Sequence, residues 1–96
     1  MEEKFITAWL GARQKAGSIG VRLRPMEAAD AMKQAHRFLQ GNRTSDGFDA
    51  LADKGHLELT LEALAVDKRF TGLFTDEEAN TALSRLLEAG YYGTKF

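Results

Sequence analysis

The stretch Leu73–Phe96, LFTDEEANTALSRLLEAGYYGTKF, carries the clearest helix signals in the chain and indicates its fold class. Thr75 and Glu78 form the Thr-x-x-Glu pattern of a capping box, in which each side chain satisfies a free backbone donor at the helix start. Apolar residues then recur with the helical period and predict one buried face. That face consists of Ala79, Ala82, Leu83 and Leu86.

The same stretch also contains a stop signal. Gly90 follows the last periodic residue, and a glycine there can adopt the left-handed conformation that ends many helices. A helix that ends in this way commonly brings the next side chain back onto its last turn. We therefore expect Tyr91 to pack against Leu86.

Two further helices are predicted before the first turn cluster. Residues Phe5, Ile6, Trp9 and Leu10 form one stripe and predict a helix at 2–14. Pro25 is the only proline, and its fixed φ suits the first position of a second helix at 25–40. The apolar face of that second helix comprises Ala28, Ala31, Met32, Ala35, Phe38 and Leu39.

Two shorter helices are predicted in the middle of the chain. The turn formers of GNRTSDG (41–47) offer Thr44, Ser45 or Asp46 as a cap for a helix that ends at Gly55. Residues 56–66 alternate leucines as a strand does, but they also contain strong helix formers. We favour a helix at 58–66 and leave the strand open. The segment DKRFTGLF (67–74) is then a linker whose aromatic residues enter the core.

These elements predict a compact all-α bundle of about five short helices in a single domain, 1–96. One addition stays open, because GVRLR (20–24) alternates apolar and basic residues in the manner of a short strand. The length of 96 residues suits one hydrophobic core and leaves too few residues for a second.

Composition excludes several classes of function. The chain has no cysteine, which removes disulfides, thiol catalysis and cysteine-based zinc sites. Its net charge of −1 argues against a strongly basic nucleic-acid binder. No apolar run approaches the roughly 20 residues that span a bilayer. The acidic start MEEKF does not resemble a signal peptide, so we expect a cytoplasmic protein without membrane contact.

Catalytic patterns are also missing from the sequence. His36 and His56 have no HExxH motif and no carboxylate at a matched spacing, so we interpret both as structural. The acidic triplet 76–78 is explained by its place in a first helical turn. We therefore expect no enzyme activity, no cofactor and no metal site.

The favoured hypothesis is a protein-binding accessory or regulatory module. Aromatic residues lie near both chain ends, and aromatic and arginine side chains dominate interface hot spots. Residues 1–48 carry eight Lys/Arg and five Asp/Glu, a charge of +3, whereas residues 49–96 carry five and nine, a charge of −4. This asymmetry suits an oriented contact with another protein or a homodimer. The candidate contact residues are Trp9, Arg22, Arg24, Tyr92 and Phe96.

The alternative is a small helical regulator that binds DNA or RNA. Residues 11–26 contain four basic residues and no acid. Leu83, Leu86 and Leu87 followed by EAGYYGTKF are similar to the end of a winged-helix recognition helix entering its wing. That resemblance implies base contacts from the closing helix, although acids outnumber bases on its outer face. The candidates are Arg13, Lys15, Arg22 and Arg24 for phosphates, and Asn80, Ser84 and Arg85 for bases.

Overall fold

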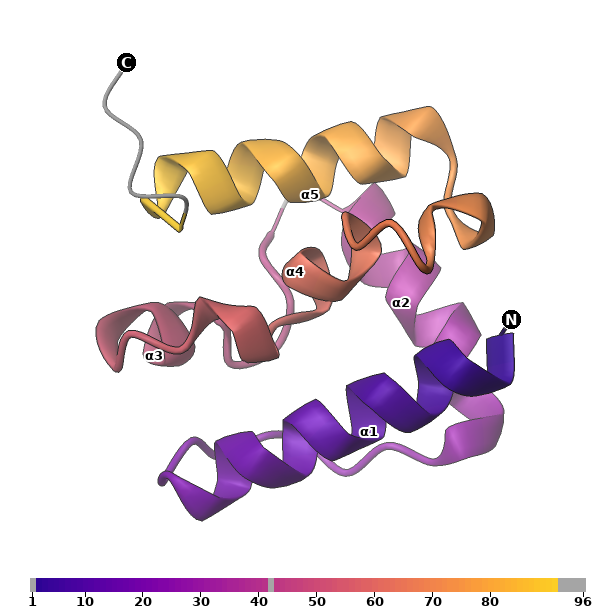
Figure 1. The fold of residues 1–96 in the computed structure, drawn as a ribbon. Coiled ribbons are helices and arrows are strands. Elements are labelled where there is room, and N and C mark those ends of the chain that lie inside the picture. The colour runs from indigo at the N-terminus through magenta and orange to yellow at the C-terminus, as the bar shows by residue number, and fades with distance from the viewer. Residues whose placement is uncertain (1, 42, 92–96) are drawn as a thin grey trace.

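A computed structural model describes residues 2–41 and 43–91 and confirms the all-α prediction. These residues form five α-helices and three short 3-10 helices: α1 (Glu2–Ser18), η1 (Ala28–Asp30), α2 (Ala31–Gln40), α3 (Phe48–Asp53), η2 (Leu57–Leu59), α4 (Leu61–Ala65), η3 (Thr71–Leu73) and α5 (Asp76–Glu88). Figure 1 shows α1 and α5 on opposite sides of the molecule, with the short helix α4 between them.

An aromatic cluster forms the centre of the main core. The Phe5 ring from α1 lies edge-on to two rings of the linker before α5, at 5.4 Å from Phe70 and 5.2 Å from Phe74 between ring centroids. Trp9, one helical turn along α1, is only 3% exposed and lies 5.8 Å from Phe5. The prediction that the linker aromatics enter the core is therefore confirmed.

Helix α1 extends to Ser18, four residues beyond the predicted end at 14. The predicted end was too early because glycine disfavours helix, yet Gly17 lies within the last turn and is exposed. Ala16 is fully buried against Val21 and Leu51, and this packing favours the extra turn. The turn that follows the helix contains Gly20, whose φ of +93° is accessible to glycine at little cost.

No strand forms at 20–24 in the described part of the chain, so that open possibility was wrong. The alternation has another cause: Val21 and Leu23 face the small cluster around Leu51, while the arginines between and after them are exposed. The Arg24 amide, which a strand would pair with a backbone carbonyl, instead donates to Asp46 Oδ2 at 2.8 Å. A side chain thus replaces the partner strand.

The second helix begins later than predicted. Pro25 does not start it, since residues 21–27 have no regular structure and Glu27 is extended, with φ −90° and ψ 149°. In a helix that started at Pro25, the Arg24 carbonyl would accept the first helical hydrogen bond. Here the Arg13 guanidinium binds that carbonyl and Asp46 binds the Arg24 amide, so the segment stays extended. The short turn η1 follows and leads into α2. Ala28 is exposed there and does not join the apolar face.

The two short helices in the middle of the chain are confirmed with different boundaries. Gly47, at φ +80°, occupies the cap position of α3 in place of Thr44, Ser45 or Asp46. The predicted helix at 58–66 is divided at Thr60, where η2 ends and α4 begins. The Thr60 hydroxyl accepts from the Ala63 amide at 3.1 Å, as a helix cap does.

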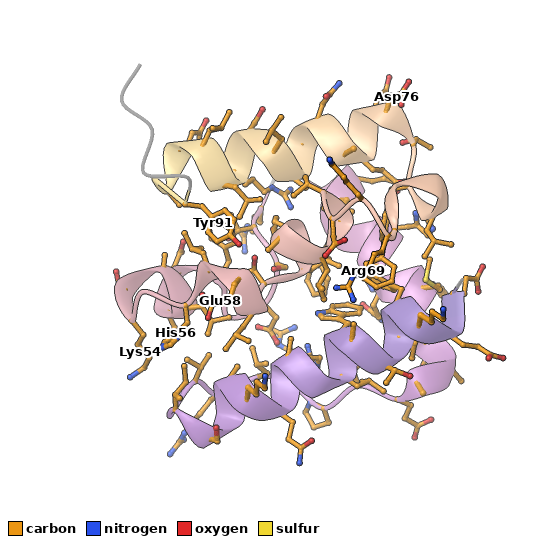
Figure 2. All side chains as sticks on the ribbon, viewed as in Figure 1. Lys54, His56, Glu58, Arg69, Asp76 and Tyr91 are labelled. Carbon is orange, nitrogen blue, oxygen red and sulfur yellow. The ribbon has the colours of Figure 1, made fainter. Side chains whose placement is uncertain are left out.

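The closing helix α5 matches its prediction most closely. Thr75 Oγ1 accepts from the Glu78 amide at 3.1 Å, and Glu78 Oε1 accepts from the Thr75 amide at 2.9 Å. Gly90 has φ +77°, and Tyr91 packs beneath the end of α5 against the cluster that contains Leu86 (Figure 2). Leu83 was wrongly assigned to the buried face, because it is 38% exposed.

Candidate functional site

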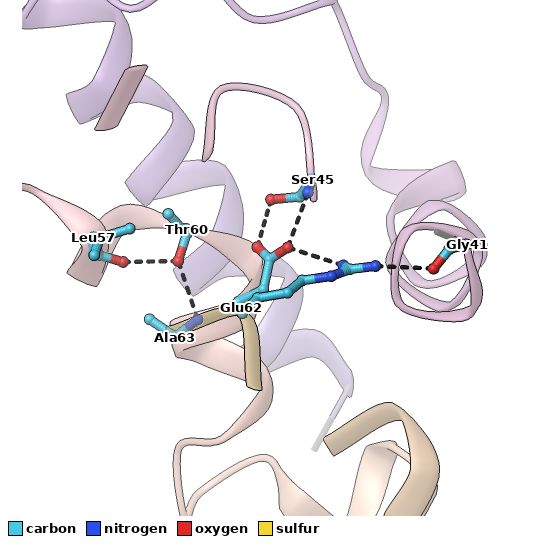
Figure 3. Close-up of polar contacts among 7 residues, drawn as sticks. Gly41, Ser45, Leu57, Thr60, Glu62 and Ala63 are labelled. Atoms are coloured by element: carbon cyan, nitrogen blue, oxygen red, sulfur yellow. Dashed lines mark hydrogen bonds and ion pairs between the residues drawn. The ribbon is translucent and has the colours of Figure 1, made fainter. Parts of the chain in front are cut away.

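A buried ionic network fixes the loop between α2 and α3. The Glu62 side chain, which is 0% exposed, accepts from the Ser45 amide at 2.9 Å and from the Ser45 hydroxyl at 2.5 Å. Arg85 Nη1 donates to the same carboxylate at 3.0 Å, and Arg85 Nη2 donates to the Gly41 carbonyl at 3.0 Å (Figure 3). The loop is therefore held at both of its ends by one carboxylate–guanidinium pair.

A second set of contacts fixes the connector between α1 and α2. The Arg13 guanidinium donates to the Arg24 carbonyl and lies 5.7 Å from the Trp9 ring centroid. Burial lowers the pKa of the Arg13 guanidinium from its ordinary value, and the nearby Asp46 carboxylate partly offsets that effect. The side chain of Arg13 is thus engaged within the molecule.

An open hollow of about 610 Å³ lies between α2, the loop and the start of α3. Three arginines from three different segments line it: Arg24 from the connector, Arg37 from the last turn of α2, and Arg43 from the loop. We call it the arginine hollow. None of these three guanidinium groups makes a hydrogen bond or an ion pair with another residue that the structure describes.

Other residues set the character of the arginine hollow. The half-buried ring of Phe38 adds an apolar surface. Two carboxylates, Asp46 and Asp49, also line the hollow, and Asp46 is already bound to the Arg24 amide. The formal charge of the lining is therefore +1, from three arginines and two aspartates.

The basic surface continues along α2 beyond the hollow. A shallow depression beside it shares Arg37 and Gly41 and is otherwise lined by Lys33, His36 and Gln40, with no described carboxylate in its lining. Lys33 lies one helical turn before Arg37. On this side Lys33 therefore continues the positive surface along α2, because His36 is hydrogen-bonded to the Glu78 carboxylate. On the other side, a second hollow that shares Arg24 and Arg37 also contains Glu27 and Asp30.

Each histidine has a carboxylate partner that was not predicted from the sequence. His36 Nδ1 lies 2.6 Å from Glu78 Oε2, which also accepts from Gln40 at 3.0 Å. Burial raises the pKa of the Glu78 carboxyl, but hydrogen bonds from the Thr75 amide, His36 and Gln40 together hold it below its ordinary value. Because Glu78 also closes the capping box, this cluster joins α2 to the start of α5.

The second histidine pair is exposed. His56 Nδ1 lies 2.9 Å from Glu58 Oε2, at the start of η2 and near Lys54 (Figure 2). The hydrogen bond from His56 lowers the pKa of the Glu58 carboxyl, and burial opposes this shift. Neither pair could be predicted from the sequence, because spacings of 42 and 2 residues fit no helical motif.

The predicted protein-binding residues are dispersed. Trp9 belongs to the core and presents almost no surface to a partner. Arg22 is exposed outside the arginine hollow, whereas Arg24 lines it. Tyr92 and Phe96 lie outside the described residues. Arg37 and Arg43, which complete the arginine hollow, were not selected from the sequence because each stands alone between neutral neighbours.

The predicted nucleic-acid residues are also divided. Arg13 and Arg24 are brought together, but Arg13 is engaged, and Lys15 is exposed in the last turn of α1. Asn80 and Ser84 are exposed on α5, on the opposite side of the molecule from α1 (Figure 1). Arg85, expected to face bases, is only 10% exposed and pairs with Glu62.

Two further properties concern the described residues as a whole. They contain no group of three or more histidine, aspartate and glutamate side chains arranged to hold a metal ion. None of their helices combines the length and the apolar composition that a membrane crossing requires.

No family model matches this sequence, and comparison with curated proteins and with solved structures found no match either.

Proposed function

We propose that this chain is a non-enzymatic accessory or regulatory module that acts by binding another protein through the arginine hollow. The observation that carries the proposal is the set of three guanidinium groups around one concave surface that have no partner among residues 2–41 and 43–91. Arginine is enriched at interface hot spots because its planar fork can donate several hydrogen bonds at once.

The protein-binding proposal is preferred to nucleic-acid binding on two grounds. Asp46 and Asp49 lie in the same hollow as the arginines, and a continuous phosphate backbone would be repelled by them. The side chains expected to contact phosphates and those expected to read bases come from opposite sides of the bundle. One duplex cannot contact both sets without wrapping around the molecule.

The proposal is preferred to catalysis because both histidine–carboxylate pairs have structural explanations. Glu78 directs its oxygens to the Thr75 amide, His36 and Gln40, so the pair stabilises the α2–α5 contact. His56 and Glu58 form an exposed local pair. Neither pair lies beside a nucleophile with an identifiable activating geometry.

Affinity capture with surface variants tests the proposal. Wild-type protein and the Arg37→Glu, Arg43→Glu and Lys15→Glu variants are immobilised, and retained proteins are identified by mass spectrometry. We expect one partner to be retained by wild type and by the Lys15 variant and lost from both arginine variants, with unchanged melting temperatures. A partner retained equally by all four proteins would refute the proposal.

A gel-retardation assay covers the nucleic-acid alternative. Electrostatic binding to phosphates is strongest at low salt, so the assay uses duplex DNA and single-stranded RNA at about 50 mM salt. The proposal predicts no retardation of either one. Retardation that is lost in the Lys15 variant as well as in the arginine variants would favour nucleic-acid binding.

A further inference from the structure

We infer that the arginine hollow binds a short acidic segment of the partner protein, with its carboxylates on the arginines and an apolar side chain against Phe38. This inference rests on the protein-binding proposal and adds the chemical class of the partner. Its basis is the chemistry of the lining residues and the rigidity of the backbone that carries them.

The described backbone beside the arginines is held by hydrogen bonds within the molecule. Arg43 lies between Gly41, whose carbonyl is held by Arg85, and Ser45, whose amide and hydroxyl are held by Glu62. The Arg24 backbone is held on both sides, because its amide donates a hydrogen bond to Asp46 and its carbonyl accepts one from Arg13. Binding then costs mainly side-chain ordering, because the loops do not have to fold around the ligand.

The three arginines of the hollow favour ligands that carry planar anionic groups spaced apart from one another. A guanidinium donates two parallel hydrogen bonds to a carboxylate, and such charge-assisted bonds are among the strongest in proteins. Three arginines on three segments can each receive one carboxylate. The volume of the hollow, about 610 Å³, is in the range of sites that enclose small ligands or a few side chains.

The two aspartates determine which kind of anion is accepted. A segment whose acidic residues alternate with neutral ones can place carboxylates on the arginines and neutral groups beside Asp46 and Asp49. A polymer with one charge at every repeat cannot avoid the aspartates in this way. The aspartates therefore favour a short, mixed acidic peptide over a nucleic acid.

The neighbouring depression gives the peptide a direction. Beyond Arg37 the lining contains Lys33 and His36 and no described carboxylate. An additional acidic residue at this end of the peptide therefore meets Lys33, whereas the same residue at the other end meets Asp49. The segment is expected to extend from the loop along α2 toward Lys33.

Fluorescence anisotropy with defined probes tests this inference. The first probe is a labelled peptide of alternating Glu and Gly residues around one Phe, the second is the same peptide with Gln in place of Glu, and the third is a single-stranded oligonucleotide of the same net charge. We expect saturable binding of the Glu peptide only. Arg37→Ala and Arg43→Ala should each weaken it about tenfold, while Lys15→Ala, which removes an exposed charge outside the hollow, should not.

Three outcomes would overturn the inference: equal binding of the Gln peptide, tighter binding of the oligonucleotide, or equal weakening by Lys15→Ala. If the Glu peptide does not bind but the captured partner still depends on Arg37 and Arg43, the inference fails and the protein-binding proposal stands. If capture also does not depend on these arginines, the protein-binding proposal fails as well. Circular dichroism of each variant confirms that the loss reflects binding and not unfolding.

Discussion

The ionic network beneath the arginine hollow leads to the most quantitative prediction. Replacing Arg85 by Met preserves most of the aliphatic stem but removes both guanidinium bonds, leaving Glu62 buried with only Ser45 as a donor. Breaking a buried pair by removing one partner costs about 3–5 kcal/mol. Because Ser45 still donates twice to the carboxylate, we expect the lower end, about 3 kcal/mol.

Urea denaturation measures that loss directly. Trp9 is the only tryptophan and is buried in the core, so its fluorescence reports global unfolding. A domain of 96 residues has a free energy of unfolding of about 5–14 kcal/mol, so the variant remains folded over most of this range. With a denaturant slope of about 1.5 kcal/mol per molar, the midpoint should fall by about 2 M.

Two controls make the prediction refutable. Arg22→Met removes an exposed arginine from the connector and should leave the midpoint unchanged. Ser45→Ala combined with Arg85→Met should give a non-additive loss, because both residues serve the same carboxylate. A loss below about 1 kcal/mol for Arg85→Met would mean that the Arg85–Glu62 pair contributes no more than a solvated surface ion pair, and it would refute the prediction.

Three further predictions concern stability. Gly47→Ala should lower the free energy of unfolding by about 1–2 kcal/mol in urea titrations, because φ is +80° there and an added Cβ would collide with Leu23. Gly11 lies in a helix with open space around it, so Gly11→Ala should raise the free energy of unfolding by about 0.5–1 kcal/mol. Thr75→Ala should lower it by about 1 kcal/mol through loss of the α5 cap, visible as a lower melting temperature, and an unchanged melting temperature would contradict the capping role. The pKa of Glu78 is lower in the folded state than its ordinary value of 4.5. The stability that the Glu78 carboxylate contributes is therefore fully present above pH 4.5 and is lost as pH falls through the folded pKa. Glu78→Gln should flatten the acid limb of the stability–pH curve, and an unchanged limb would contradict this assignment.

The elements that were predicted well are those specified by local chemistry. The capping box of α5 and the terminating glycines at 55 and 90 act within a few residues of themselves, so the pattern alone specifies them. The alternation at 20–24 misled the strand prediction because packing on one side produces the same pattern as a paired strand. Only tertiary contacts distinguish these cases.

The candidate site was largely hidden from the sequence for the same reason. Arg24, Arg37 and Arg43 are 13 and 6 residues apart along the chain and converge only when the loop folds against α4 and α5. The loop folds there because of Glu62, which reads as an ordinary helix former. Arg85 was assigned to an outer face because helical periodicity does not reveal that a long side chain can reach a buried carboxylate.

The most direct test of the central claim is an NMR titration of isotope-labelled protein with the Glu peptide. We expect the largest shifts in the side-chain Nε–Hε signals of Arg24, Arg37 and Arg43 and in the amides of residues 43–49, with little change on α5. Shifts centred instead on the exposed leucines of α5, Leu83 and Leu87, which are 38% and 36% exposed, would contradict the claim and place the binding surface on the opposite side of the molecule from α1.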